Sequence, residues 1–327
     1  MRVLIVGAAG SLGRQLAPQL AARGHEVVCF DLQRVAGEPP PGCRWITGDL
    51  LVPHALAEAA EGCDALVHIP AWHGIHLRHR TRRDFWTLNV DGTFNAFQAA
   101  LTVGAHKVVY CSAMGVYGGI PRPADRALRV TDASPVIPAG DIYAYTKVIG
   151  EQLCALYQRV YGLAVVERAQ LGMFVPTGFA HYGLRLLHGG VDERDLAQAC
   201  RLALEDDQAR GMYNLFAPTP FVEGDEAALI GDPAAVVRRH YADAAVLDHL
   251  AAGRDLPTAP CYTATDAGGV VPTPIRTYWR SDRAREELGW RPEYDFARFL
   301  RDWRDTEVPY ARENRYPVPG APARWQP

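Results

Sequence analysis

A tyrosine and a lysine stand four residues apart near the middle of the chain, in the stretch from Tyr143 to Lys147. This stretch is predicted to be helical, so the two side chains lie on the same helix face. An ammonium close to a phenol stabilises the phenolate and lowers a pKa that normally lies near ~10. The phenol is then suited to act as a general acid or base. We therefore expect Tyr143 to move a proton and Lys147 to assist it.

Three glycines follow the first predicted strand and open a predicted helix. Gly7, Gly10 and Gly13 have the spacing that lets a dinucleotide pyrophosphate approach bare backbone N–H groups at a helix N-terminus. The first glycine permits the sharp turn, the second removes a Cβ that would meet a phosphate, and the third allows close helix packing. An ordinary turn between a strand and a helix is the alternative. The residues expected to contact the dinucleotide are Gly7, Ala9, Gly10, Ser11, Leu12 and Gly13.

Acidic residues after the next two strands bear on the kind of dinucleotide. Asp31 ends the second predicted strand, about 20 residues past the glycine turn, where a carboxylate binds ribose hydroxyls and repels a 2′-phosphate. This favours NAD over NADP, and Arg34 weakens the preference. Asp49 and Leu50, after the third strand, are placed to contact the adenine, with a helix N-cap as the alternative for Asp49.

Lysine is rare in this chain. Lys107 and Lys147 are the only lysines among 34 basic residues, so arginine fills the other positive positions. Each lysine is therefore expected to do something that a planar guanidinium does not. For Lys147, this is a contact with the ribose hydroxyls next to the nicotinamide, and an incidental lysine on a helix surface is the alternative.

Strands and helices alternate in the elements that must position these residues. Continuous apolar runs predict strands that are buried on both faces, and the rhythm predicts an α/β fold of the Rossmann type, with a doubly wound parallel sheet. The predicted strands are Arg2–Val6, Glu26–Phe30, Arg44–Ile46, Ala65–Ile69, Lys107–Cys111, Ala164–Arg168 and Tyr213–Phe216. The predicted helices are Leu12–Arg23, Pro53–Ala60, Arg83–Val103, Tyr143–Tyr161, Asp192–Leu204, Pro233–Ala251, Ser281–Leu288 and Asp295–Asp305.

Composition excludes several classes of protein. The chain has 327 residues, 48% of them hydrophobic, and a net charge of −3, which predicts a soluble globular protein and gives no electrostatic basis for binding nucleic acid. No apolar run approaches the ~18 residues of a membrane span, so no membrane partner is expected. Seven scattered cysteines without a C-x-x-C pair argue against a disulfide framework and predict a cytoplasmic location.

The order and spacing of the motifs resemble those of the extended short-chain dehydrogenase/reductases, the NAD-dependent epimerase/dehydratase group. The resemblance implies NAD as cofactor, hydride transfer at a sugar carbon, Tyr143 as catalytic acid/base and Lys147 as its activator. It also implies an NAD-binding Rossmann domain over residues 1–168, with later returns near 192–216, and a smaller C-terminal substrate-binding domain over 169–327. Nearly the whole chain is covered, through Gly7–Gly13, Asp31, Asn89–Thr93, Val116–Gly118, Tyr143 with Lys147, Tyr213-Asn214 and Ser281–Trp290. Further expected cofactor contacts are Ile69, Pro70, Ala71 and Asn89.

Ala113 departs from the pattern of this family. The family's fifth strand usually ends in two hydroxyl residues, and the second, four positions before the tyrosine of Val116–Gly118, bonds the reacting oxygen. That position holds Ala113 here. Ser112 precedes it, and strand alternation directs Ser112 the other way. Either the loop re-aims Ser112, which stays a candidate catalytic residue, or another group supplies the bond, or transition-state stabilisation is weaker by roughly a few kcal/mol.

Two further departures concern the substrate. Sugar 4,6-dehydratases of similar sequence carry an acidic pair where this chain has Met114 and Gly115, which argues against that reaction. The family's Arg-x-x-Asn pattern reads Arg168 to Leu171, and the following segment is short, as in the uronate dehydrogenases of the same superfamily. The candidate substrate contacts are His73, Met114, Gln170, Leu171, His181 and Arg185.

Three clusters have competing interpretations. The histidines around Trp72 have irregular spacing and no accompanying Cys or paired carboxylate, which argues against a metal site. His73 or His76 is expected to line the substrate pocket, because ligands bind after the carboxyl ends of such strands. The Arg78–Arg83 cluster is expected to face water, with an anionic substrate as the alternative. The helices Arg83–Val103 and Tyr143–Tyr161 form a dimer seam in similar enzymes, so a homodimer and burial within one subunit both stay open.

The sequence thus predicts an NAD-dependent enzyme that oxidises a secondary alcohol of a sugar or nucleotide-sugar, with Tyr143 taking the hydroxyl proton. Reduction of the ketone from its other face gives epimerisation, the favoured outcome. Release of NADH makes the protein a sugar or uronate dehydrogenase, the alternative. A non-catalytic dinucleotide sensor is a competitor of another class, motivated by Ala113 and opposed by the acid/base pair.

Overall fold

The computed structural model describes residues 1–35, 39–170, 179–241, 262–264, 270–272 and 274–305. Its centre is a seven-stranded sheet in the order β3-β2-β1-β4-β5-β7-β8, in which all neighbours pair in parallel. The strands are β1 (Arg2–Val6), β2 (Glu26–Asp31), β3 (Cys43–Thr47), β4 (Ala65–His68), β5 (Lys107–Cys111), β7 (Ala164–Gln170) and β8 (Gly211–Leu215). The doubly wound order confirms the predicted Rossmann-type fold.

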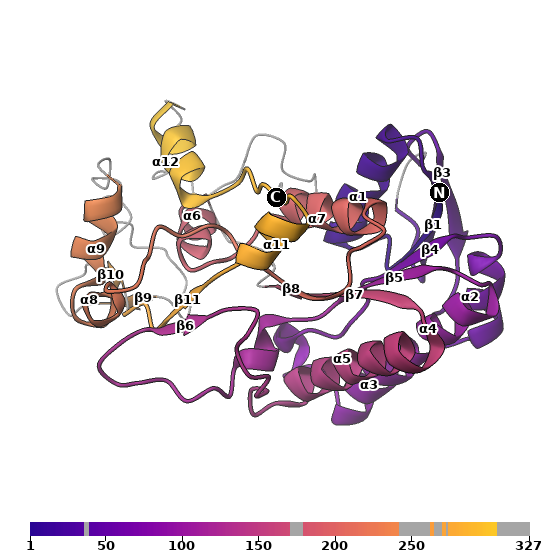
Figure 1. Cartoon of the computed structure of the whole chain (residues 1–327), viewed down its shortest axis with the longest axis horizontal. Helices are drawn as coiled ribbons and strands as arrows, with labels where there is room; N and C mark the ends of the chain where they lie inside the picture. Colours follow the sequence, from indigo (N-terminus) through magenta and orange to yellow (C-terminus); the bar gives the residue numbers. More distant parts are fainter. Residues whose placement is uncertain (36–38, 171–178, 242–261, 265–269, 273, 306–327) are drawn as a thin grey trace.

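Helices cover both faces of this sheet, as Figure 1 shows. One face is covered by α1 (Ser11–Ala22) and α7 (Glu193–Glu205), which pack against each other, with α11 (Asp282–Glu287) against β8. The other face is covered by α2 (Pro53–Ala60), α4 (Gly92–Thr102) and α5 (Ile142–Tyr161). Two separate apolar clusters fill these two interfaces, so strands such as β1 and β5 are buried on both sides.

The long helix predicted over Arg83–Val103 forms in three consecutive parts. These are α3 (Arg82–Trp86), a π-helical turn η2 (Thr87–Asp91) and α4. Asn89 lies in the π turn and is buried. Such turns are uncommon and often occur at functional sites, because they change the direction of a few side chains without ending the helix.

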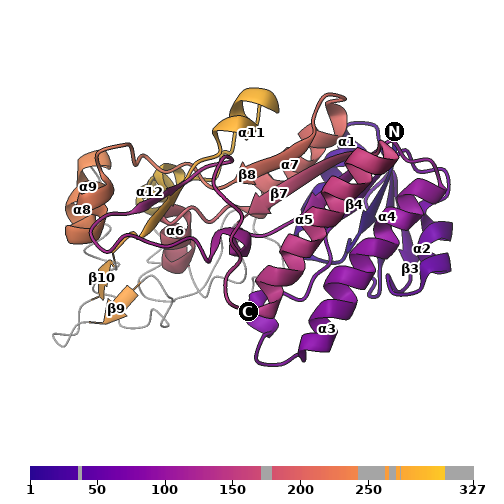
Figure 2. The same cartoon turned by 60° about the horizontal axis from the view of Figure 1, so that its bottom comes forward.

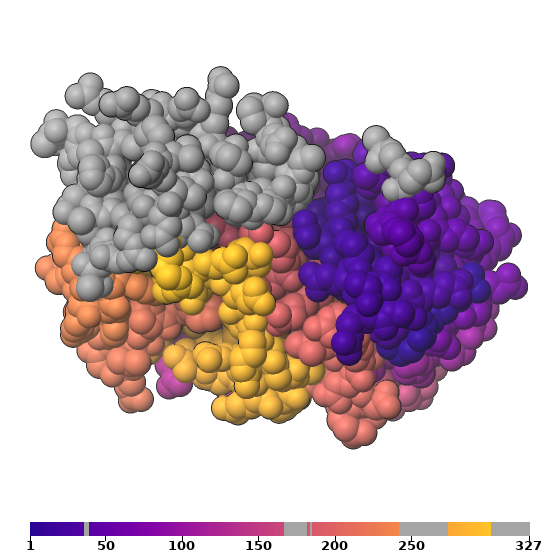
Figure 3. All heavy atoms as spheres, turned by 90° about the horizontal axis from the view of Figure 1, so that it is seen from above, coloured from indigo at the N-terminus to yellow at the C-terminus, as the bar shows by residue number. Residues whose placement is uncertain are grey.

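The remaining elements form a second lobe, at the left of Figure 1. It contains β6 (Leu128–Val130) paired with β11 (Thr277–Trp279), the hairpin of β9 (Tyr262–Ala264) and β10 (Val270–Pro272), and the helices α6 (Phe179–Leu187), α8 (Glu226–Gly231), α9 (Pro233–His240) and α12 (Phe296–Asp305). An apolar cluster of its own joins α6, α9 and α12. Figure 3 shows this lobe and the N-terminal residues at opposite ends of the molecule.

The sequence patterns predicted the strands of the central sheet more completely than the elements of the second lobe. All seven predicted strands belong to the sheet, although their ends differ by a few residues. The strands β6, β9, β10 and β11 and the helices α6 and α8 were not predicted, because each is short and lies among glycines and prolines. The helix predicted over Pro233–Ala251 ends as α9 at His240, and residues 242–251 lie outside the described ranges.

Candidate active site

The register of the sheet brings four loops to one edge. Val6 pairs with both Phe30 and His68, and His68 pairs with Tyr110, so the turns after β1, β2, β4 and β5 leave the sheet at the same level. Ligands of doubly wound folds bind at this carboxyl edge, near the point where the strand order reverses between β1 and β4.

The glycine turn after β1 has the backbone expected of a phosphate cradle. Gly7 has a φ of +85°, and its N–H donates to Phe30 O at 2.9 Å. A Cβ on Gly13 would lie 2.6 Å from Ala8 Cα, so only glycine lets α1 pack this close to the turn. Gly10 precedes α1 without a side-chain cap, and the first turn of α1 has no acidic residue. The N-terminal N–H groups of α1 therefore suit an anion.

Asp31, the last residue of β2, is hydrogen-bonded to the turn that follows β1. Its Oδ2 accepts from Ala9 N at 2.9 Å, and its Oδ1 accepts from Gln33 N at 3.0 Å. The carboxylate is thus held beside the glycine turn, as expected of a residue that binds a ribose. Asp49 instead accepts from Leu51 N at 2.9 Å, whereas the N-cap of α2 is Val52, so the predicted alternative of a helix cap is wrong.

A cleft of about 320 Å³ runs along this edge of the sheet. Most of its walls are apolar side chains and bare backbone. Its lining contains eight of the predicted cofactor residues and one predicted substrate residue, namely Gly7, Gly10, Asp31, Asp49, Leu50, Ile69, Pro70, Ala71 and His73. By contrast, Leu12 and Gly13 are buried in the packing of α1. The cleft, the glycine cradle and the carboxylate together fit a dinucleotide such as NAD.

Tyr143 lies next to the loop after β4, which contributes His73 to the lining of the cleft. Asp141 caps α5 by accepting from Ala144 N at 2.9 Å, which places Tyr143 in the first turn of the helix. The hydroxyl of Tyr143 lies 3.4 Å from His73 Nδ1, and the two rings meet edge to face with centroids 5.8 Å apart. The phenol is therefore next to a side chain that lines the cleft.

Lys147 lies one turn further along α5 and is almost fully buried. Its Nζ donates to Cys111 O at 2.6 Å, at the end of β5, and lies 5.0 Å from the centroid of the Tyr110 ring. The pKa of Tyr143 lies above its usual value, because burial, and then the neighbours Asp141 and Cys111, disfavour the phenolate. The predicted lowering of this pKa by Lys147 is therefore wrong for the chain by itself, because burial and both neighbours raise the pKa and Lys147 is not among the causes of the shift.

The second lysine has a structural role. Lys107 Nζ donates to Ala203 O at 2.9 Å and also to Asp206 O, at the C-terminus of α7. A cation there satisfies carbonyls that lack partners within the helix and interacts favourably with the helix dipole.

Asn89 fastens the loop after β4 to α5. Its Oδ1 accepts from Trp72 N at 2.8 Å, and its Nδ2 donates to Trp72 O at 3.0 Å and to Thr146 Oγ1 at 2.9 Å. Both polar atoms of the amide are engaged, and the π turn directs them toward the loop. Asn89 therefore positions His73, the residue after Trp72, and it does not line the cleft.

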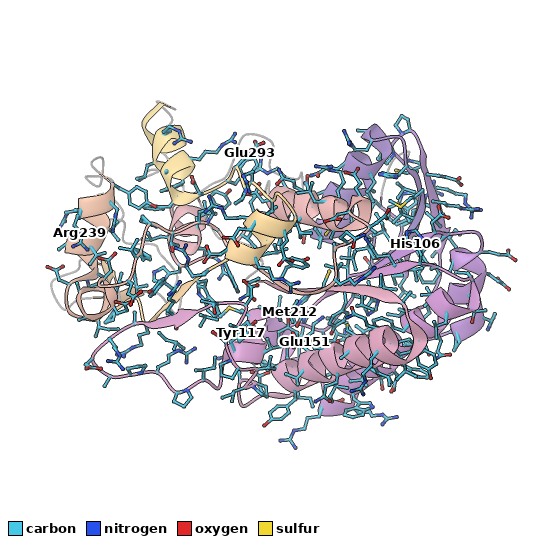
Figure 4. The ribbon with its side chains drawn as sticks, viewed as in Figure 1. His106, Tyr117, Glu151, Met212, Arg239 and Glu293 are labelled. Atoms are coloured by element: carbon cyan, nitrogen blue, oxygen red, sulfur yellow. The ribbon has the colours of Figure 1, made fainter. Side chains whose placement is uncertain are left out.

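Ser112 does not contact Tyr143 in the structure. Its Oγ donates to Glu151 Oε1, and both residues are buried. Figure 4 labels Glu151 on α5, near the middle of the molecule. The expected strand alternation therefore holds, and the candidate catalytic role of Ser112 is not supported by its contacts. The next residue, Ala113, is 5% exposed and precedes the 3₁₀ turn η3 (Met114–Tyr117).

Glu151 is a residue that the sequence reasoning missed. Burial raises its pKa to about 7, against the opposing effects of the hydrogen bond from Ser112 and of the Lys147 charge. Its spacing was the available signal: it follows Lys147 by four residues, so a carboxylate shares the buried face of the helix with the lysine.

The histidines near Trp72 have separate environments. His68 is buried in the sheet, stacks on Tyr110 with centroids 5.9 Å apart, and its Nε2 lies 3.0 Å from Thr93 Oγ1. His73 and His76 belong to the 3₁₀ turn η1 (Gly74–His76) and its N-cap. Within the described ranges, no three His, Cys, Asp or Glu side chains are arranged to hold a metal ion.

The other predicted groups are only partly described. The arginines of the Arg78–Arg83 cluster are exposed, as expected, and Arg80 stacks on Trp72 at 4.0 Å. Met114 begins η3 and Arg185 lies on α6. Leu171 and the side chains of Gln170 and His181 lie outside what the structure describes. No helix of the described part is long and apolar enough to cross a bilayer.

The fold and the cleft define a dinucleotide-binding α/β protein, in which a tyrosine contacts a residue of the cleft lining and a lysine follows it one turn along the same helix. The sequence matches the model of the NAD dependent epimerase/dehydratase family over residues 3–169, and the chain belongs to this family. The cofactor of the family is NAD, and the residues around the cleft fit it.

Known sequences similar to this chain are distant. The protein y4nG of Sinorhizobium fredii is 27% identical over 323 residues, which cover 91% of this chain and 76% of that protein. A 3 beta-hydroxysteroid dehydrogenase/Delta 5-->4-isomerase of Mycobacterium tuberculosis is 30% identical over 168 residues, which cover 50% of this chain and 44% of that enzyme. The match to the second relative thus covers less than half of its length.

Solved structures share the fold over most of the chain. A double mutant of the dTDP-glucose 4,6-dehydratase DesIV from Streptomyces venezuelae, with NAD bound, aligns with a TM-score of 0.66 and 24% identity over 94% of this chain and 98% of that one. The uronate dehydrogenase of Agrobacterium tumefaciens aligns with a TM-score of 0.61 and 20% identity over 98% of this chain and 91% of that one. These likenesses establish the architecture.

Proposed function

We propose that this protein is an NAD-dependent sugar-modifying enzyme that oxidises a secondary alcohol of a sugar or nucleotide-sugar, with Tyr143 as acid/base. The observation that carries the proposal is the position of the Tyr143 hydroxyl, 3.4 Å from a side chain that lines the cleft, with Lys147 one turn away on α5. A dinucleotide sensor would have no use for such a pair.

In this proposal Tyr143, Lys147 and Asp31 have separate roles in proton transfer and cofactor binding. Bound NAD supplies the acceptor for the hydride. Tyr143 takes the proton of the substrate hydroxyl as the carbonyl forms, and returns it in the reverse direction. Lys147, held by Cys111 O, places a positive charge one turn along α5 from Tyr143, and its role in the proposal is to offset part of the cost of forming the phenolate once a substrate is bound. Asp31 selects the ribose hydroxyls of NAD over a 2′-phosphate.

Two outcomes of the same chemistry are distinguished by the net redox change. An epimerase returns the hydride to the other face of the ketone and leaves NAD oxidised, whereas a sugar or uronate dehydrogenase releases one NADH per turnover. We favour epimerisation on the family match, with dehydrogenation as the alternative.

A panel of free uronates, free sugars and UDP- or dTDP-sugars tests the proposal, with NADH absorbance and product stereochemistry as the readouts. Tyr143→Phe should bind NAD with unchanged affinity and lose turnover by at least about 10²-fold. Tyr145→Phe, two residues away on the exposed side of α5, is the matched control and should keep full turnover. Undiminished turnover in Tyr143→Phe would remove the tyrosine from the reaction.

A second candidate substrate class is an apolar secondary alcohol or ketone. It is supported by the 30% identity of the cofactor-binding half to a relative named for a 3 beta-hydroxysteroid reaction. Apolar residues such as Ile69, Pro70 and Leu88 in the cleft lining agree with it. A 3-hydroxysteroid in the same panel decides between the classes, because only one kind of substrate should be turned over, as shown by NADH release or by a change in product stereochemistry.

We further infer a homodimer in a reducing compartment such as the cytoplasm. Figure 2 shows α3, α4 and α5 side by side. These helices expose large apolar side chains, including Phe94, Tyr145 and Val160 at 46%, 53% and 58%. A second copy of the chain would cover them. Sedimentation should show a dimer that Val160→Glu weakens, whereas Val222→Glu, at a valine of similar exposure in the other lobe, should not.

A further inference from the structure

The end of β5 provides no hydroxyl for a reacting oxygen. Ala113 has no polar side-chain atom and is buried, and the hydroxyl of Ser112 is engaged by Glu151 on α5. If Tyr143 exchanges a proton with a substrate, the oxygens that share this proton need a further hydrogen bond, because charge that develops on them in a dry site is costly without one.

His73 approaches the Tyr143 hydroxyl from the loop after β4, the strand that pairs in parallel with β5. Its Nδ1 lies 3.4 Å from the Tyr143 hydroxyl, which is long for a hydrogen bond and within the distance that closes when a ligand binds. The edge-to-face contact of the two rings keeps Nδ1 at the phenol oxygen. His73 also lines the cleft, so one imidazole contacts the phenol and faces the ligand space.

The backbone around His73 is firmly held. The N–H of His73 donates to His76 Nδ1 at 2.9 Å, and both backbone polar groups of Trp72 are bonded by the amide of Asn89. Asn89 itself lies in the π turn η2, and its Nδ2 donates to Thr146 on α5. The loop after β4 is thus fixed to the helix that carries Tyr143, and an imidazole on it is preorganised.

The charge state of His73 suits this use. Burial, and then the positive charge of Lys147 and the neighbouring His76, lower the pKa of His73 to about 3, so the ring is neutral near pH 7. A neutral imidazole can accept from a phenol at Nδ1 in one tautomer and donate to a phenolate in the other. It can therefore serve both protonation states of Tyr143 without adding a second cation beside Lys147.

We propose that His73 is a catalytic residue of this protein, and that from the loop after β4 it supplies the hydrogen bond to the reacting oxygens that a hydroxyl at position 113 would supply from β5. This inference rests on the proposed function, because it assumes that Tyr143 is the acid/base. The substrate hydroxyl proton passes to the Tyr143 oxygen, which must be in the phenolate state to accept it, the hydride passes from the same carbon to a bound nicotinamide dinucleotide, and a carbonyl forms. During these transfers His73 hydrogen-bonds to the oxygens that share the proton, and its imidazole stays neutral.

The contact can be tested without a substrate. In long-range ¹H–¹⁵N spectra of the full chain, the Nδ1 resonance of His73 should shift in Tyr143→Phe and stay unchanged in Tyr145→Phe, which lies on the exposed face of α5. The resonance of His73 Nδ1 is assigned as the one that is missing from the spectrum of His73→Asn. An Nδ1 resonance that ignores the loss of the Tyr143 hydroxyl would overturn the proposed contact.

The catalytic role is tested by exchange of the two positions. With NAD and D-glucuronate or UDP-glucose as probes, His73→Ala should lower kcat by about 10²-fold with NAD affinity unchanged within about twofold, as for loss of one preorganised donor. His73→Asn, whose amide nitrogen can replace Nδ1, should retain most of kcat. Adding Ala113→Ser to His73→Ala should recover at least about tenfold. His79→Ala, at an exposed histidine of the same segment, is the control and should match the unmodified chain.

The outcomes separate this inference from the proposed function. Loss of turnover in Tyr143→Phe together with full turnover in His73→Ala would overturn the role of His73 and leave the proposed function intact. Full turnover in Tyr143→Phe would overturn the proposed function itself. A His73→Ala variant that Ala113→Ser fails to rescue, with NAD affinity lost in parallel, would assign His73 a purely structural role and contradict the proposal.

Discussion

The hydroxyl of Ser112 donates to the carboxyl group of Glu151, which lies one helical turn after Lys147 on α5. This bond ties the end of β5 to the helix that carries Tyr143. It also engages the hydroxyl of the residue that follows β5, and the next residue, Ala113, has none. The region behind the cleft therefore holds an acid and a lysine close together in an apolar setting, and this predicts a pH dependence.

Glu151 should make the protein less stable as the pH rises. Burial raises its pKa to about 7, whereas a carboxyl group in the unfolded chain titrates near ~4.5. Between these values the folded chain binds more protons than the unfolded chain, so the free energy of unfolding falls with pH, by at most on the order of 3 kcal/mol for this group. The stabilisation is complete below about 4.5 and is lost above about 7.

Glu151→Gln should flatten this part of the stability curve, because the amide oxygen can still accept from Ser112 and does not ionise. Urea unfolding at pH 5 and pH 8 measures the change. Asp195, whose pKa burial also raises to about 7, contributes a slope of the same sign that remains in the variant. An unchanged difference between the two pH values would show that Glu151 is not the titrating group.

Gly13→Ala should destabilise the glycine turn. The added Cβ would lie 2.6 Å from both Ala8 Cα and Ala8 O, which are backbone atoms that cannot rotate away. We expect a loss of about 2 kcal/mol or more from displacement of α1 against β1, together with weaker NAD binding. Gly140→Ala, where no atom lies within 4 Å of the added carbon, is the matched control. Thermal unfolding with and without NAD measures both effects, and equal melting temperatures for the two variants would contradict the packing argument.

The strands of the sheet could be predicted from the sequence because each is marked by a pattern within its own few residues. Apolar runs such as Val3–Val6 and Val108–Cys111 form strands that helices cover on both sides, and the glycine spacing marks the first turn without reference to the rest of the chain. Strand alternation also favoured a Ser112 that points away from the site, but a re-aimed loop stayed open and Ser112 was kept as a candidate catalytic residue, a role that its bond to Glu151 does not support.

Contacts between distant segments could not be predicted in this way. His73 and Tyr143 are 70 residues apart, and Lys107 and Ala203 are 96 apart. No pattern within either segment specifies the partner, because both contacts depend on how the loops leave the sheet. The π turn at Asn89 also has no simple sequence signal, yet it decides that the amide holds Trp72 and does not line the cleft.

Asp31→Asn should weaken the preference for NAD over NADP. The substitution removes the negative charge that repels a 2′-phosphate and one of the two oxygens that accept from Ala9 N and Gln33 N. We expect the ratio of the two dissociation constants to move toward NADP by about tenfold, equivalent to about 1.4 kcal/mol. Asp49→Asn is the control, since Asp49 accepts only from the backbone of its own turn. Titration calorimetry with both dinucleotides measures the ratio, and an unchanged ratio in Asp31→Asn would exclude Asp31 from ribose recognition.

The two lysines form a natural pair for separating stability from function, because both are buried and both donate to backbone carbonyls. Lys107→Met would leave Ala203 O and Asp206 O at the end of α7 without their donor, so we expect a loss of about 1–3 kcal/mol in stability and unchanged kcat. Lys147→Met removes the donor to Cys111 O and, on the proposed function, should lower kcat by about 10²-fold, because the positive charge that the proposal assigns to the support of Tyr143 is lost. Chemical unfolding and turnover of the two variants, measured on the same preparations, test this division. Equal losses of kcat in both variants would mean that Lys147 supports the fold and not the reaction.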